Sequence, residues 1–171
     1  MTMILTLSVF ESPVGPLGLA CDGDGRLRGV SFEGGLERAM RREYPGARFV
    51  AGPTGPAAAE ALAAYFGGER DALRRAPWSL EGAAAGDGFQ ARVWKALAEV
   101  PAGETISYGE MARRAGEPGA AQAAGVALNR NPLPVVLPCH RVIGADGAMV
   151  GFGGGLERKT WLLRHEGALL I

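Results

Sequence analysis

The sequence predicts an α/β N-terminal domain, a small antiparallel sheet with helices, followed by a mainly α C-terminal domain that contains a helix-turn-helix. Short β-like runs broken by turn residues fill the first 32 residues, and helical spacing of apolar residues dominates from residue 89 onward. Between these regions, residues 81–88 read Glu-Gly-Ala-Ala-Ala-Gly-Asp-Gly, which is typical of a flexible linker. We therefore expect domains at residues 1–85 and 86–171.

In the N-terminal domain, turn residues separate the predicted elements. Ser-Pro-Val-Gly-Pro and Asp-Gly-Asp-Gly divide three short apolar runs, which favours an antiparallel sheet. A later Ala-rich segment carries Leu62, Tyr65 and Phe66 on one side and ends in Gly67-Gly68, as a helix with a glycine stop would. The predicted strands are residues 5–10, 17–21, 27–32 and 78–80, and the predicted helices are residues 35–45 and 56–67.

In the C-terminal domain, an apolar stripe at helical spacing predicts a helix from about residue 89 that ends before Pro101. Ser107 followed by Glu110 is a capping-box signature for a second helix, and Gly116 supplies its stop. Pro118 is a favourable first residue for a third helix that runs to about Asn129. Two short helices joined by a tight turn are typical of a helix-turn-helix, although many such hairpins bind nothing.

The third helix is rich in Ala and Gly, so its backbone can approach another surface closely. Tight packing between helices and close approach to a ligand both remain open.

The composition limits the classes of protein to which the chain can belong. A chain of 171 residues that is 47% hydrophobic is long enough to bury a core. No apolar run reaches the roughly 18 residues of a membrane helix, and no signal peptide is recognisable, so we expect a cytoplasmic protein. The formal net charge is zero, with nine basic and eleven acidic residues in 1–91 and nine and seven in 92–171. This balance does not by itself point to a polyanionic partner.

The two cysteines, Cys21 and Cys139, lie too far apart in sequence to suggest a disulfide framework. A zinc site would need both of them together with His140 and His165, so we predict no metal. Cys21 lies in an apolar strand and is expected to be a core residue. Cys139 follows Pro138 in a β-like segment and precedes His140, which makes it a nucleophile candidate that needs a base. Because neighbours in a strand point apart, a bend or a bridging water must connect the two side chains.

The segment Pro-Cys-His-Arg-Val, residues 138–142, resembles the active-site signature of the O6-alkylguanine-DNA alkyltransferases. The resemblance is dense over the C-terminal half and loose over the N-terminal half, where only Ser-Pro-Val-Gly-Pro-Leu matches. The other matching segments are Phe89-Gln90, Val93-Trp94, Ile106-Ser107-Tyr108, Asn131-Pro132, Gly151-Phe152-Gly153-Gly154 and residues 159–166.

This resemblance implies direct DNA repair. The Cys139 thiolate would take the alkyl group from guanine O6, or from O4 of thymine, in a single turnover and without a cofactor. The partner would be double-stranded DNA carrying O6-alkylguanine, with the damaged base flipped out of the stack, and the protein would act as a monomer.

The resemblance also implies roles for individual residues. The catalytic set is Cys139 as nucleophile, His140 as base through water, Glu166 as the residue that orients His140, and Asn131, which ties the active-site turn. The substrate-binding set is Tyr108, Pro134, Val142, Phe152, Gly153 and Gly154, and the DNA-binding set is Ser107, Ala120, Ala121, Gln122, Gly125 and Arg130. Local sequence alone would instead leave Glu166 solvated at a helix C-terminus, and it makes Arg141 a structural partner for a carboxylate.

One position departs from the family pattern. Gln122 stands where the family usually has an arginine that enters the base stack, and glutamine has neither the charge nor the stacking plane of a guanidinium. We therefore expect weaker or slower repair of duplex DNA, partly offset by Arg130. The departure keeps open a protein that recognises alkylated DNA without transfer, although Cys139 is present. A cysteine hydrolase is a third class, and it would turn over repeatedly.

Overall fold

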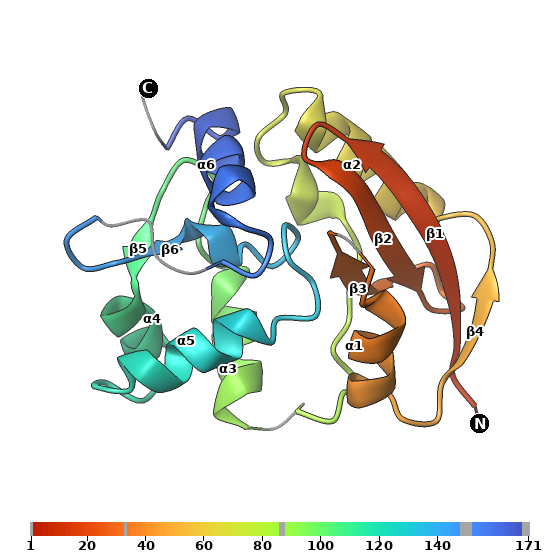
Figure 1. Cartoon of the computed structure of the whole chain (residues 1–171), viewed down its shortest axis with the longest axis horizontal. Coiled ribbons are helices and arrows are strands. Elements are labelled where there is room, and N and C mark those ends of the chain that lie inside the picture. The colour runs from red at the N-terminus through yellow and green to blue at the C-terminus, as the bar shows by residue number, and fades with distance from the viewer. Residues whose placement is uncertain (1, 33, 86–87, 148–151, 169–171) are drawn as a thin grey trace. The chain divides into compact units, whose positions relative to one another are not determined.

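The computed structural model describes residues 2–32, 34–85, 88–147 and 152–168, and the chain divides into the units Met1–Gly86 and Asp87–Ile171. The first unit combines a four-stranded sheet with helices, and the second is mainly helical (Figure 1). The predicted α/β character is therefore confirmed.

The sheet of the N-terminal unit has the strand order β3-β2-β1-β4. Its strands are β1 (Ile4–Ser12), β2 (Gly15–Cys21), β3 (Leu27–Ser31) and β4 (Arg48–Ala51). A tight turn joins β1 to β2, and Gly15 adopts a φ of 102° there, a conformation that suits glycine.

The three strands predicted in the first 32 residues pair antiparallel, as expected, but the sheet is mixed because it has a fourth strand that was not predicted. The pairs β1–β2 and β2–β3 are antiparallel, whereas β4 runs parallel to β1. Between β3 and β4 the helix α1 (Leu36–Glu43) carries the chain across, which allows parallel pairing at the opposite edge. A strand of four residues is too short to show the alternation that would have predicted it. The expected strand at residues 78–80 is only a single bridge between Trp78 and Leu27.

Helices complete the N-terminal unit. The helix α1 packs closely against β3, because a Cβ at Gly29 would lie 2.5 Å from the Met40 side chain. The helix α2 (Pro56–Phe66) begins at a proline and ends before Gly67-Gly68, as predicted, and a short 3₁₀ helix η1 (Ala72–Arg75) follows. Leu5, Ala20, Met40 and Tyr44 form a buried cluster.

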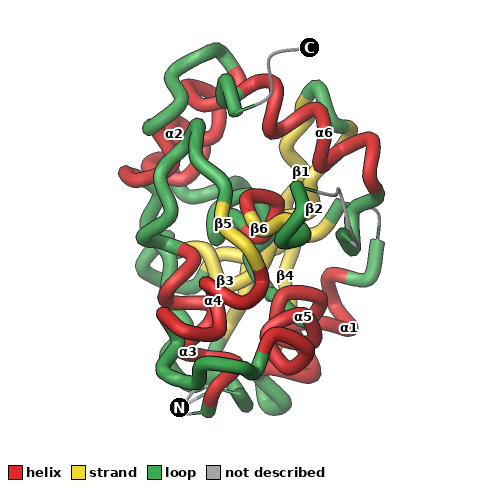
Figure 2. Tube along the Cα trace, turned by 90° about the vertical axis from the view of Figure 1, so that its left-hand side faces the viewer, coloured by secondary structure: helices red, strands yellow, loops and turns green. Residues whose placement is uncertain are grey.

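The C-terminal unit surrounds one short parallel strand pair with helices. Figures 1 and 2 both place β5 and β6 between α6 and the pair α4–α5. The elements are α3 (Phe89–Leu97), β5 (Ile106–Ser107), α4 (Tyr108–Arg114), α5 (Ala121–Asn129), the 3₁₀ helix η2 (Cys139–Arg141), β6 (Val142–Ile143) and α6 (Leu156–His165).

Two of the helix predictions in this unit are confirmed. The predicted apolar stripe of α3 is buried, and Trp94 Nε1 donates a hydrogen bond of 2.8 Å to the Ala127 carbonyl of α5. Ser107 caps α4 by accepting a hydrogen bond from the Glu110 backbone N–H at 3.0 Å. The Glu110 carboxylate instead pairs with Arg113 and Arg114.

The predicted start of the third helix is wrong. The helix α5 begins at Ala121 rather than at Pro118. Gly119 has a φ of 88°, in the left-handed region, so the chain cannot continue a right-handed helix through this position.

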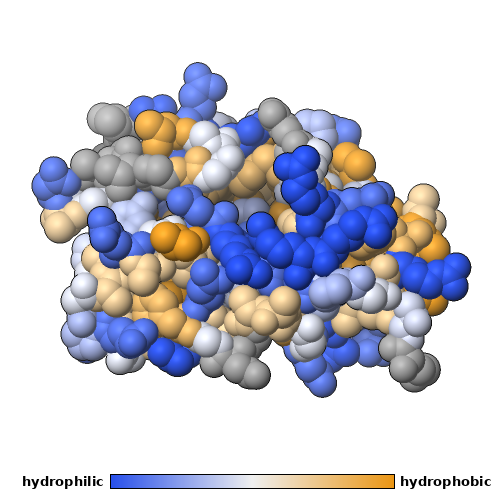
Figure 3. Space-filling model, turned by 60° about the horizontal axis from the view of Figure 1, so that its bottom comes forward, coloured by the Kyte–Doolittle hydropathy of each residue, from blue (hydrophilic) through white to orange (hydrophobic). Residues whose placement is uncertain are grey.

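Among the described residues, no helix combines the length and apolar character needed to cross a lipid bilayer. The face drawn in Figure 3 mixes hydrophilic and apolar side chains over its surface. Large exposed apolar residues are separate in sequence, for example Ile4, Val9, Val126 and Leu156. Scattered apolar residues of this kind are normal at protein surfaces.

Candidate active site

The loop before Cys139 is held by Asn131. Its Nδ2 donates to the Leu137 carbonyl at 2.8 Å, and its Oδ1 accepts from the Leu133 backbone N–H at 2.9 Å. Inside this loop Val135 is buried and has a φ of 74°, which is strained for a β-branched residue and costs about 1 kcal/mol or more. The two Asn131 hydrogen bonds help to hold the chain in this conformation.

The sequence suggested that Cys139 lies in a β-like segment, and the structure shows that this is wrong. It is the first residue of the 3₁₀ helix η2, and the Arg141 backbone N–H donates to the Pro138 carbonyl at 3.0 Å. Successive side chains in a 3₁₀ helix are rotated by about 120°, whereas those in a strand point to opposite faces. The required bend after Pro138 is therefore present. Because of it, the side chains of Cys139 and His140 point in more similar directions than they would in a strand.

His140 is oriented by Glu166 from the end of α6. His140 Nε2 lies 2.8 Å from Glu166 Oε2, and both side chains are fully buried. Because an ionised carboxylate only accepts, Nε2 carries the proton and donates, and Nδ1 keeps a lone pair. Among the described residues, Nδ1 is buried and makes no protein hydrogen bond.

Arg141 binds the Glu166 carboxylate through two hydrogen bonds. Its Nε donates to Glu166 Oε1 and its Nη2 to Glu166 Oε2, both at 2.8 Å, while Nη1 donates to the Val100 carbonyl at 2.5 Å. The prediction that Arg141 is a partner for a carboxylate is confirmed. The local expectation of a solvated Glu166 is wrong, because this C-cap residue of α6 lies on the buried side of the helix end, together with Leu162 and Leu163.

Burial and neighbouring charges set the protonation states of the site. Burial raises the pKa of Cys139 to about 11, against the opposing effects of a hydrogen bond from Asn131 and the charge of Lys159. Burial lowers the pKa of His140, and Glu166 acts in the opposite direction. Burial by itself would raise the pKa of Glu166, but His140 and Arg141 lower it below its usual range. The resting site therefore holds a neutral thiol, a neutral imidazole and a carboxylate.

Lys159 is a site residue that residue-by-residue reasoning missed. Its side chain is fully buried in α6, and Nζ donates to the Val142 carbonyl at 2.7 Å. Burial lowers the pKa of Lys159, and the nearby Cys139 raises it. Lys159 and Glu166 lie seven residues apart, so they share one helix face with the buried Leu162 and Leu163. That periodicity could have identified the lysine.

Tyr108 lies close to the thiol as the first residue of α4. The strand β5 pairs with β6, aligning Ile106 with Val142, and this pairing places the start of α4 beside the Cys139 turn. Burial raises the pKa of Tyr108, and Cys139 adds to the rise. A Cβ at Gly125 would lie 3.8 Å from the Tyr108 ring, an ordinary van der Waals contact, so α5 passes beside this ring at Gly125.

The remaining predicted substrate residues lie in three places: the Asn131 loop, β6 and the turn before α6. Pro134 is half-buried in the Asn131 loop, and the Val142 carbonyl is already bonded to Lys159. Phe152, Gly153 and Gly154 form a turn before α6, where the Gly154 carbonyl accepts from Arg158 at 3.0 Å. Gly151, which belongs to the same matching segment, lies outside the described residues.

The predicted DNA-binding residues lie on α4, α5 and their flanks. On α5, Ala124, Ala127 and Leu128 are buried, whereas Gln122 and Val126 are exposed. The inner face of this small-residue helix is therefore used for packing, and its outer face is open. Ser107 caps α4; Ala120, Ala121, Gly125 and Arg130 are half-buried.

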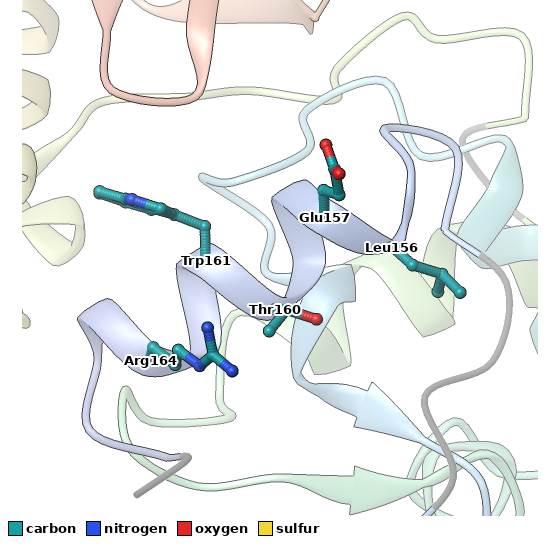
Figure 4. A pocket seen from close by; sticks show the side chains of 5 residues that line it. All are labelled: Leu156, Glu157, Thr160, Trp161 and Arg164. Carbon is teal, nitrogen blue, oxygen red and sulfur yellow. The ribbon is translucent and has the colours of Figure 1, made fainter. Parts of the chain in front are cut away.

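Cys21 and a surface pocket on α6 do not belong to the site around Cys139. Cys21 is buried in β2, as expected of a core residue, and the described residues contain no group of three or more His, Cys, Asp or Glu side chains that could hold a metal. A pocket on the outside of α6 has a lining that, among the described residues, comes from that helix and includes no predicted site residue (Figure 4). Its lining is Leu156, Glu157, Thr160, Trp161 and Arg164.

Comparison with known proteins places the chain among relatives of one family. Residues 88–168 match the family described as 6-O-methylguanine DNA methyltransferase, DNA binding domain. The methylated-DNA–protein-cysteine methyltransferase of Salmonella typhimurium is 40% identical, covering 94% of each chain. The crystal structure of Mycobacterium tuberculosis O6-methylguanine methyltransferase is 38% identical, covers 95% of this chain and 93% of that chain, and has a TM-score of 0.76. A crystal structure of the M. tuberculosis protein in complex with DNA has a TM-score of 0.75 at 38% identity, covering 98% and 93%. The chain therefore belongs to the family of methylated-DNA–protein-cysteine methyltransferases.

Proposed function

We propose that this protein repairs alkylated DNA directly, by moving an alkyl group from O6 of guanine, or O4 of thymine, onto Cys139. The observation that carries the proposal is a buried cysteine beside a histidine whose Nε2 is held by Glu166 and whose Nδ1 retains its lone pair. The names of the relatives, which describe transfer from methylated DNA to a protein cysteine, support it. The reaction consumes the protein, because the thioether that forms is stable.

The chemistry is a single displacement. The Cys139 proton passes through a water molecule to His140 Nδ1, and the sulfur electron pair forms a bond to the alkyl carbon. The bond between that carbon and guanine O6 breaks, and its electron pair stays on the base. The guanine anion then takes up a proton, so that the products are guanine and S-alkylcysteine. Burial raises the pKa of Cys139 to about 11, so the thiol needs a base that takes its proton during the reaction.

The site residues have distinct roles in this proposal. Asn131 holds the turn, and Tyr108 contacts the flipped base and the neighbouring phosphate. Pro134, Val142 and the turn Phe152–Gly154 line the guanine site. The pair α4–α5 acts as a helix-turn-helix on double-stranded DNA, with the exposed face of α5 in the minor groove and the protein acting as a monomer. Ser107, Ala120, Ala121, Gln122, Gly125 and Arg130 form the DNA-contacting set.

Intact-protein mass spectrometry tests the transfer. The protein is mixed with a duplex oligonucleotide that contains O6-methylguanine, and unmodified DNA and the variant Cys139→Ala serve as controls. We expect the mass of one methyl group, located on Cys139 by peptide mapping, and no gain in either control. Binding to the lesion without a mass gain would instead identify a protein that recognises alkylated DNA without transfer. Release of a product with repeated turnover would indicate a hydrolase.

The exposed Gln122 provides a second test. An arginine at this position would add a charge and a stacking plane, so Gln122→Arg should bind duplex DNA a few-fold more tightly, on the order of 1 kcal/mol. The repair rate should rise with it, while thermal stability stays unchanged because the side chain is exposed. Binding is measured by fluorescence anisotropy at fixed salt, with Ala123→Arg as the control for added charge. If both variants bind alike, the position has no special role.

A further inference from the structure

The Glu166 carboxylate accepts hydrogen bonds from both His140 and Arg141. Its Oε2 accepts from His140 Nε2 and from Arg141 Nη2, both at 2.8 Å, and its Oε1 accepts from Arg141 Nε at 2.8 Å. The side chains of His140 and Glu166 are fully buried, and that of Arg141 is 8% exposed, so water cannot replace these bonds. The bond from Arg141 Nη1 to the Val100 carbonyl fixes the guanidinium plane.

The charges of this cluster oppose protonation of His140. A guanidinium is always charged in proteins, so Arg141 and Glu166 already form a neutral pair. A proton on His140 would therefore leave the cluster with a net positive charge in the interior. Within the described part of the chain, the charged and titratable groups around the imidazole are Cys139 and Arg141 from η2, Lys159 from α6, and Glu166 at the C-cap of α6. Burial lowers the pKa of His140, Glu166 opposes this, and Arg141 and Lys159 add to the lowering.

We propose that Arg141 is a positioning residue for the alkyl transfer: by sharing the Glu166 carboxylate with His140, it keeps the imidazole neutral and its Nδ1 lone pair free to accept a proton. This inference rests on the transfer proposed above. In a histidine–carboxylate pair without such an arginine, a proton on the histidine would neutralise the carboxylate. Here the carboxylate orients the ring through Nε2 while its charge is already balanced.

Removal of the guanidinium charge should make the base less available at acidic pH. Without Arg141, Glu166 would stabilise the protonated imidazole, which can no longer accept the Cys139 proton. The acidic limb of the transfer rate against pH should then move to higher pH. At alkaline pH the imidazole is neutral in either case, so the rates should converge.

Two variants separate charge from geometry. Arg141→Gln removes the positive charge, and Arg141→Lys keeps it. Both variants lose the paired hydrogen bonds from the guanidinium to Glu166. The single-turnover rate of methyl transfer from an O6-methylguanine duplex is measured by intact mass from pH 5 to 9. At about pH 6 we expect Arg141→Gln to be about tenfold slower than Arg141→Lys, with similar rates near pH 8. Equal losses at every pH would show a purely structural role and overturn the inference.

If the Arg141 variants do not fold, the protonation state of His140 can be measured directly in the wild-type protein. The chain contains two histidines, His140 and His165, so ¹⁵N NMR of labelled protein can follow both, with His165→Asn to assign the signals. We expect His140 to stay neutral, with its proton on Nε2, below the pH of about 6.5 at which an unperturbed histidine titrates. Protonation at or above that pH would contradict the inference.

The two proposals can fail separately. A wild-type protein that gains no methyl group would disprove the transfer, whereas the NMR experiment does not depend on transfer. A wild type that transfers, but whose Arg141→Gln variant has an unshifted pH profile, would disprove only the role of Arg141.

Discussion

The protein contains two buried cysteines, and each is followed by a charged or titratable residue that belongs to a buried ionic cluster. Cys21 ends β2 and precedes Asp22, whose Oδ2 accepts from Arg28 Nε at 2.8 Å. Cys139 begins η2 and precedes His140, which is bound to Glu166. Burial raises the pKa of both thiols, so burial by itself does not distinguish them.

The sign of the neighbouring charge distinguishes the two thiols. The Asp22 carboxylate raises the pKa of Cys21 further, whereas Lys159 and an Asn131 hydrogen bond act to lower that of Cys139. Asp22 accepts from the backbone N–H groups of Asp24 and Arg26, so its hydrogen bonds stabilise a turn. In the cluster beside Cys139, Glu166 instead orients the His140 ring, whose Nδ1 makes no protein hydrogen bond among the described residues. The comparison fits a structural role for the Asp22 cluster and the chemical role proposed for the His140 cluster.

The largest expected effect comes from neutralising the carboxylate in each cluster. Glu166→Gln should slow methyl transfer by about 100-fold or more, because His140 loses its orienting acceptor. Asp22→Asn should leave the rate unchanged but should lower the free energy of unfolding by about 3 kcal/mol, because Arg28 is left buried without its partner. Single-turnover rates and urea unfolding of both variants check this. A slow Asp22→Asn variant would mean that the first cluster also affects the chemistry.

A smaller effect should follow from removing the lysine charge. In Lys159→Met the pKa of Cys139 should rise further, so the thiolate fraction at neutral pH falls and alkylation by iodoacetamide slows about tenfold. The loss should shrink as the pH is raised toward the pKa of the thiol. Peptide mass spectrometry follows Cys139 and Cys21 in the same molecules, and Cys21 should react as before. An equal change at both cysteines would indicate general loosening of the fold.

The smallest effect is expected for Cys21→Ala. Loss of one buried sulfur should lower the free energy of unfolding by about 1 kcal/mol and leave the methyl-transfer rate unchanged. Thermal unfolding and the intact-mass assay measure the two quantities. A reduced methyl gain would show that Cys21 contributes to repair, and the contrast between the two cysteines would fail.

Local sequence determined the features that depend on near neighbours in the chain. Ser107 caps α4 through Glu110, three residues away, and Gly67-Gly68 ends α2. The buried face of α3 follows from the spacing of its apolar residues, and the short motif around Cys139 identified the nucleophile candidate. In each case the residues that interact lie within one or two turns of each other, so their order in the sequence carries the information.

Only the tertiary structure decided which distant groups meet. The parallel pairing of β4 with β1 depends on a crossover, and the start of α5 depends on the backbone conformation at Gly119. Arg141 and Glu166 are 25 residues apart, and Lys159 reaches the Val142 carbonyl from another element. A charged residue written in a sequence is most often solvated, and it becomes part of a site only where folding buries it against a partner. For this reason the sequence indicated the candidate nucleophile and its neighbouring candidate base, while the packing of α6 against η2 decided the charges that surround them.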